Sequence, residues 1–201
     1  ARRSCSHLEC IPCASEFSAT DARRQEGRYK RIMLAVGDDK KLYGKEGALE
    51  LTDAEHRRLI ATLNRSRKRD RQRRLLLIRI EGALPGGRLI NMTDDVSVEH
   101  ILPKGASPWW NERFPDQVRR NDLVNLIGNQ TLITHEQQKL ADNKSYPDKR
   151  AVYFDTAGAP IPALRESLRE VQELTAEIIE GRQETMLSAL CSDWGLFDGR
   201  W

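Results

Sequence analysis

The stretch Val96-Ser-Val-Glu-His-Ile-Leu-Pro103 decides the fold, together with Gly128-Asn-Gln-Thr-Leu-Ile133 further along the chain. In the first stretch apolar and polar residues alternate until a proline ends the pattern, which predicts a short strand. The end of this strand presents an acid, Glu99, beside an imidazole, His100. A carboxylate next to a histidine can hold a divalent metal beside a general base, as metal-assisted hydrolysis requires. The second stretch predicts another strand, followed by a helix over residues 135–142 that Thr134 can cap.

Composition predicts a well-solvated, mostly helical protein with a modest core. Of the 201 residues, 31% are charged and only 6% are aromatic, and this length allows one domain or two small ones. No apolar run approaches the ~20 residues that span a bilayer, and no secretory signal opens the chain. We therefore expect a cytoplasmic protein without a membrane partner. Ala1 in place of an initiator methionine suggests a processed chain or a fragment of a longer one.

A basic run lies between residues 65 and 74, where Asp70 is the only acid. Its seven cations are Arg65, Arg67, Lys68, Arg69, Arg71, Arg73 and Arg74. Such a cluster is typical of a surface that binds polyanions such as nucleic acid. A solvated helix face and a surface for an acidic partner are the alternatives.

Three cysteines near the start of the chain have the spacing of a metal-binding knuckle. Cys5, Cys10 and Cys13 enclose His7, whereas the fourth cysteine, Cys191, is near the other end. A structural zinc site needs four ligands, which His7 or Cys191 would have to complete. We prefer free thiols in a reducing cytosol and do not expect zinc there.

The rest of the chain alternates helical patterns with breakers. Helices are predicted from Asp21 to about Val36, after a capping box at Thr52-Asp-Ala-Glu55, over Leu75–Ile80, from Pro115 to about Asn125, and from Lys149. A long apolar pattern from Leu164 to Leu190 follows, which Gly181 is expected to split into two helices. We divide the chain into an N-terminal helical region (1–87), a central region (88–158) and a C-terminal helical region (159–201), which we expect to pack as one unit.

Three motifs carry a resemblance to a known family. Val98-Glu-His-Ile-Leu-Pro103, Leu126-Ile-Gly-Asn-Gln-Thr-Leu-Ile133 and Asn143-Lys-Ser-Tyr-Pro-Asp-Lys149 resemble the C-terminal HNH nuclease domain of GmrSD-type restriction endonucleases. A related arrangement occurs in the phosphorothioate-sensing SspE proteins. The resemblance covers residues from about 60 to 195. It implies an α+β fold that is mostly helical, with a small ββα-metal (HNH) core at 88–158 surrounded by helices.

The resemblance also implies a metal-dependent DNA endonuclease or nickase with roles for particular residues. His100 would be the general base, Asn129 would orient its ring, and Glu99 would bind Mg²⁺, with Mn²⁺ as the alternative metal. The helix after the second strand usually supplies an asparagine ligand, whereas this chain has Gln138, so His135 and Asn143 are candidate substitutes. The expected DNA or phosphate ligands are Asn143, Lys149, Arg67, Lys68 and Arg71.

The implied partner is foreign or modified DNA, in a system that defends the cell. The family usually joins this domain to an N-terminal nucleotide-hydrolysing sensor domain, and this chain lacks the Gly-x4-Gly-Lys-Ser/Thr loop of such a domain. We therefore expect that domain in a longer chain or in a partner. The alternatives are a catalytically weak DNA-binding module that has lost its helix ligand, and a helical interaction domain. The same residues also have purely structural explanations. In these, Glu99 and His100 form a surface pair, Lys149 is solvated, and Trp109 and Trp110 pack in the core.

Overall fold

The computed structural model describes residues 22–38, 41, 47–48, 52–64, 70–91, 94–105, 107–155 and 160–194. The cysteine knuckle at 5–13 and residues 65–69, which include Arg67 and Lys68, lie outside these ranges. The chain divides into two compact units, one formed by Ala1–Arg65 with Asp193–Trp201 and the other by Ser66–Ser192. Both predicted strands belong to the second unit.

The first unit contains the helices α2 (Ala22–Ala35) and α4 (Asp53–Asn64). The capping box predicted for α4 is confirmed, since the Thr52 amide donates to Glu55 Oε2 at 2.8 Å and the Glu55 amide donates back to Thr52 Oγ1 at 3.3 Å. Leu59 and Leu63 are buried, as their helical spacing predicts. The apolar side chains of α2 do not form a buried face, because Tyr29 is 60% and Met33 71% exposed.

A two-stranded antiparallel sheet forms the centre of the second unit. Strand β1 (Ser97–His100) pairs with β2 (Gln130–Ile133), and the register places His100 opposite Gln130. Both strands are shorter than the sequence suggests. Gly128 and Asn129 belong to a 3-10 turn, η1 (Ile127–Asn129), that leads into β2.

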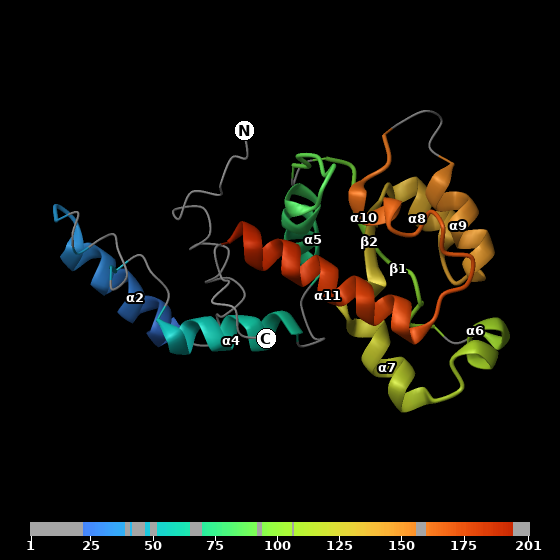
Figure 1. Ribbon diagram of the computed structural model, residues 1–201, viewed down its shortest axis with the longest axis horizontal. Helices are drawn as coiled ribbons and strands as arrows, with labels where there is room; N and C mark the ends of the chain where they lie inside the picture. The colour runs from blue at the N-terminus through green and yellow to red at the C-terminus, as the bar shows by residue number, and fades with distance from the viewer. Residues whose placement is uncertain are drawn as a thin grey trace. The chain divides into compact units, whose positions relative to one another are not determined.

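Helices contact the sheet from both sides (Figure 1). Helix α5 (Asp70–Ala83) contacts both strands, α8 (His135–Ala141) contacts β1, and α10 (Ala163–Glu166) contacts β2. Helix α9 (Tyr146–Phe154) packs on α8. The remaining helices of this unit are α6 (Pro108–Arg113), α7 (Gln117–Asn125) and α11 (Ala176–Asp193). The described residues therefore form an α+β structure dominated by helices.

The start of α8 is fixed by the cap that the sequence predicts. The Gln137 amide donates to Thr134 Oγ1 at 3.1 Å, and the Thr134 amide donates to Gln137 Oε1 at 3.2 Å. Both are amides that a helix start would otherwise leave unpaired. Because α8 begins directly after β2, this capping box sets the position from which Gln138 faces β1.

The apolar core of the second unit joins the loop after β1 to the helices. Ile101, Leu102 and Trp110 are fully buried in one cluster with residues of α7, α9 and α11. The indole of Trp110 donates to the Lys144 carbonyl at 2.9 Å, so this tryptophan is a core residue with its polar atom satisfied. The core-packing explanation is therefore confirmed for Trp110.

The structure corrects one helix prediction and moves the start of another. Gly181 does not split a helix, because α11 runs through it without a break. The helix predicted from Lys149 begins three residues earlier, at Tyr146, and Pro147 lies in its first turn, where its missing amide hydrogen costs nothing. Trp109 and Trp110 lie in α6, which Ser107 caps.

Helix α11 passes very close to the turn before β2. A Cβ atom on Gly128 would lie 2.1 Å from the Ile179 carbonyl oxygen, so only glycine fits. The Gly128 amide donates to Gln183 Oε1 at 2.8 Å, and Arg182 Nε donates to the Gly128 carbonyl at 2.8 Å. These contacts with α11 fix the position of the turn that leads into β2.

Within the described ranges no helix is both long and apolar enough to cross a membrane.

Candidate active site

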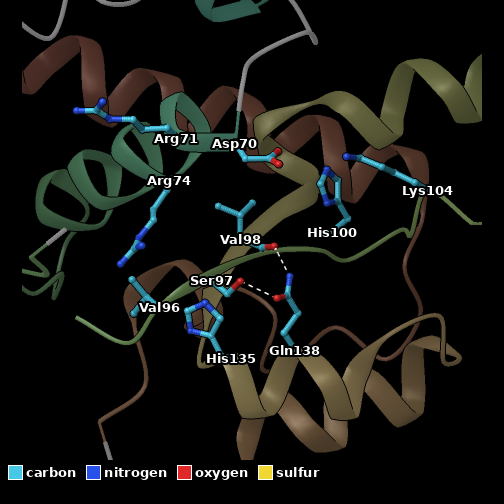
Figure 2. Close-up of a pocket in the computed structure, with 10 residues that line it drawn as sticks. All are labelled: Asp70, Arg71, Arg74, Val96, Ser97, Val98, His100, Lys104, His135 and Gln138. Carbon is cyan, nitrogen blue, oxygen red and sulfur yellow. Dashed lines mark hydrogen bonds between the residues drawn. The ribbon is translucent and has the colours of Figure 1, made fainter. Parts of the chain in front are cut away.

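A pocket of about 490 Å³ lies along β1 between α5 and α8 (Figure 2). Three of its ten lining residues come from α5, four from β1 and the residue before it, one from the loop after β1 and two from α8. They are Asp70, Arg71, Arg74, Val96, Ser97, Val98, His100, Lys104, His135 and Gln138. Three of them, Arg71, Arg74 and Lys104, are cations, and Asp70 is the one acid in this lining, so the pocket favours an anion.

His100 lies at the end of β1, in the pocket, between Asp70 and Lys104 (Figure 2). Its Nε2 atom is buried and has no hydrogen-bond partner among the described residues. The pKa of His100 is lowered to about 3, mostly by burial and to a smaller degree by the nearby cations Lys104 and Arg73. His100 is therefore neutral near pH 7, which is the form that can accept a proton.

Glu99 faces the other side of β1 and is buried in an ion pair. Its Oε1 accepts hydrogen bonds from Lys149 Nζ at 2.5 Å and from the Tyr153 hydroxyl at 3.2 Å. Burial raises the pKa of Glu99 and lowers that of Lys149, while the attraction between the two groups opposes both shifts. Lys149 Nζ also donates to the His100 carbonyl at 2.8 Å. The pair therefore holds the backbone of the residue that points into the pocket.

The hydrogen bonds of the Asn129 side chain go to backbone groups among the described residues, whereas the resemblance implies a role at the His100 ring. Asn129 Oδ1 accepts from the Leu102 amide at 2.7 Å, and its Nδ2 donates to the carbonyls of Leu102 and Val124 at 2.9 and 3.1 Å. The buried amide is thus fully used in clamping the backbone directly after His100. Asn129 can affect the histidine through the chain but not through its ring.

Gln138 is brought to the pocket, where it binds the edge of β1 (Figure 2). Its Oε1 accepts from the Ser97 hydroxyl at 2.6 Å, and its Nε2 donates to the Val98 carbonyl at 2.9 Å. His135, one turn earlier, lines the same pocket and pairs through Nδ1 with Asp95. Gln138 and His135 therefore both line the pocket, His135 at the Val96 and Ser97 end away from His100 (Figure 2), whereas Asn143 is exposed and its side chain lies against Gly105.

The two predicted metal ligands do not converge on one cation position. Glu99 faces Lys149 and Tyr153, away from the pocket, whereas the amide of Gln138 is bonded to β1 on the pocket side. Nor do the described residues include any group of three or more His, Cys, Asp or Glu side chains placed to hold a metal ion. The donors therefore do not fit the predicted two-ligand Mg²⁺ site, and the lysine ammonium supplies the positive charge beside Glu99.

The predicted phosphate ligands are only partly brought together. Arg71 is exposed and lines the pocket, but Lys149 is 1% exposed and its ammonium is committed to Glu99, so it offers no surface to a phosphate. Sequence reasoning missed Lys104, which is exposed beside His100. Arg120 fixes the loop that carries it by donating to the Pro103 and Gly105 carbonyls at 3.0 and 2.6 Å. The sequence signal that could have identified Lys104 is its position directly after Pro103.

A comparison with known families identifies the family of this chain. A family model described as "GmrSD restriction endonucleases, C-terminal domain" matches residues 51–189, well over half of the chain. The chain belongs to this family, whose description indicates a restriction endonuclease-type function with DNA as the substrate. No match was found among the curated proteins or among the solved structures.

Proposed function

We propose that this domain hydrolyses DNA phosphodiester bonds as the endonuclease or nickase of a restriction system, with His100 as the general base. The observation that carries the proposal is a neutral histidine at the end of β1, in a pocket with Arg71, Arg74 and Lys104. The cations would hold the phosphate. His100 would take a proton from the water that attacks phosphorus, and the leaving oxygen would take up a proton from solvent.

Three finer features of the proposal rest on the family resemblance: an HNH-type core, a nucleotide-hydrolysing sensor partner, and foreign or modified DNA as the target. Divalent-metal dependence also stays a prediction, and chelation followed by addition of Mg²⁺ or Mn²⁺ tests it. A general base alone contributes roughly 10²–10⁴-fold. Positioning and charge neutralisation would have to supply the rest of the rate.

A supercoiled-plasmid assay tests the assignment of the base. His100→Ala should reduce the rate of nicking by roughly 10²–10⁴-fold, while DNA binding at low salt is retained. His56→Ala is the matched control, because this histidine belongs to α4 in the other compact unit. Cutting that survives the His100 substitution would remove the histidine from the mechanism. Running modified and unmodified plasmids side by side reports the target preference.

A DNA-binding module without catalysis is the second candidate. The observation that favours it is Gln138, whose two amide atoms are both bonded to β1 and so present no free ligand to the pocket. Under this candidate the protein binds plasmid DNA but leaves it uncut with either metal. Gln138→Asn, which restores the residue usual in the family, should then produce cutting if the glutamine is the cause.

A further inference from the structure

Gln130 is a buried polar residue that the fold does not explain. Its side chain is fully buried at the start of β2, and neither Oε1 nor Nε2 has a hydrogen-bond partner among the described residues. Buried amides are nearly always paired, because an unpaired buried amide loses its hydrogen bonds to water and gains none within the protein. A hydrophobic residue would fill the same volume without this cost. The glutamine therefore indicates a task beyond packing.

The register of the sheet places this amide beside His100. The two residues are cross-strand partners, so their side chains lie on the same face of the sheet. The Ile101 amide donates to the Asn129 carbonyl at 2.9 Å, which makes the adjacent pair, His100 with Gln130, a non-hydrogen-bonded one. In such pairs the side chains approach most closely. The Gln130 amide and His100 Nε2, two buried groups without described partners, thus belong to neighbouring side chains on one face of the sheet.

We propose that Gln130 is the positioning residue of His100, and that its Oε1 accepts the Nε2 proton of the ring. This inference rests on the proposed function, because it specifies which ring nitrogen acts as the base. A neutral imidazole has one donor nitrogen and one acceptor nitrogen. An acceptor beside Nε2 selects the tautomer protonated there and leaves the Nδ1 lone pair unprotonated.

The geometry of the pocket agrees with this choice of tautomer. His100 lines the pocket, and Nε2 is its ring nitrogen that is buried without a partner in the described part of the chain. We therefore assign Nδ1 as the nitrogen that water in the pocket reaches. Asn129 cannot take this role, since its amide is committed to the Leu102 and Val124 backbone. We therefore assign the positioning role to Gln130, the next residue along the chain, and not to Asn129.

Nuclear magnetic resonance of the ¹⁵N-labelled histidine rings at pH 7 tests the inference directly. Two-bond proton–nitrogen correlations distinguish the tautomers, and the spectrum of His100→Ala identifies the signals of His100. The wild-type chain should show Nε2 protonated and Nδ1 free. Gln130→Met, which keeps the volume but removes the acceptor, should give a mixture of tautomers. Wild-type protein with Nδ1 protonated would overturn the proposal, as would a tautomer unchanged in Gln130→Met.

The kinetic arm uses a control on the same strand. Gln130→Met should lower kcat for plasmid nicking by about 10–100-fold with little change in KM, as loss of an orienting partner does. Thr131→Val removes another buried polar atom that lacks a described partner, but on the Glu99 face, and should leave kcat unchanged. Equal effects of the two variants would contradict a specific role for Gln130.

Two further outcomes keep the proposal separate from the proposed function. If Gln130→Met fails to fold, Gln130→Glu retains an acceptor oxygen and should preserve the wild-type tautomer; a changed tautomer there contradicts the proposal. If the wild-type protein cuts no DNA, the proposed function fails. The tautomer of His100 then still decides whether Gln130 positions the ring.

Discussion

At the scale of single residues, burial controls the charge of His100, and this has a consequence for stability. Its pKa is lowered from 6.5 to about 3 in the folded chain, so between these values the unfolded chain binds a proton that the folded chain does not. The contribution of His100 to the free energy of unfolding is therefore fully present above pH 6.5 and declines as the pH falls toward 3.

Urea unfolding at pH 6.5 and pH 5 measures this effect. Over this interval the free energy of unfolding of the wild-type chain should fall by roughly 2 kcal/mol more than that of His100→Gln, since each pH unit contributes about 1.4 kcal/mol. The comparison with the variant removes the contribution of other titrating groups. Equal losses in both proteins would show that His100 titrates normally in the folded state.

The buried pair of Glu99 and Lys149 yields a second prediction at this scale. Lys149→Met leaves a carboxylate unpaired at a site that is 5% exposed, and should lower the free energy of unfolding by about 3–5 kcal/mol. The double variant Glu99→Met with Lys149→Met removes both charges and should recover most of that loss. Urea unfolding of both single variants and the double variant measures the coupling. Additive losses would mean that the two side chains do not act as a pair.

At the scale of elements, Asn129 joins the end of β1 to η1 and α7. Asn129→Leu leaves the Leu102 amide and two carbonyls without their side-chain partner in a buried site, and should cost about 3 kcal/mol or more in unfolding free energy. Asn125→Ala is the control, because the hydrogen bond of this amide within the described part of the chain goes to the Asn121 carbonyl at the surface of α7. Its effect should stay within about 0.5 kcal/mol. Similar losses for both variants would refute the clamp.

Local sequence signals predicted the elements that carry the site but not the contacts between them. Alternation found β1, and the Thr134 cap found α8, because both signals are complete within a few residues. The ion pair of Glu99 with Lys149 joins positions 50 residues apart, and no local pattern contains it. The role of Gln130 likewise depends on the strand register. Interactions across the fold decided which polar residues face the pocket.

At the scale of the whole molecule, the cations beside the pocket should control DNA binding through salt. Each phosphate contact releases about one counterion, so Lys104→Ala and Arg71→Ala should each lower the slope of log K against log salt by about 1. Arg169→Ala is the control, since this exposed arginine is paired with Glu166 and does not line the pocket. Titration of a fluorescent duplex at several salt concentrations measures the slopes. An unchanged slope for Lys104→Ala would place the DNA elsewhere.

The contact between Gly128 and α11 also bears on the order in which the chain folds. The bond from the Gly128 amide to Gln183 spans 55 residues, and Arg182 holds the Gly128 and Gln130 carbonyls from the same helix. During synthesis β2 leaves the ribosome well before α11 does, so the strand that faces His100 lacks its support until nearly the whole domain has been made. A nascent or truncated chain would thus carry every residue of the pocket without the assembled site, which delays any cutting activity until the domain is complete.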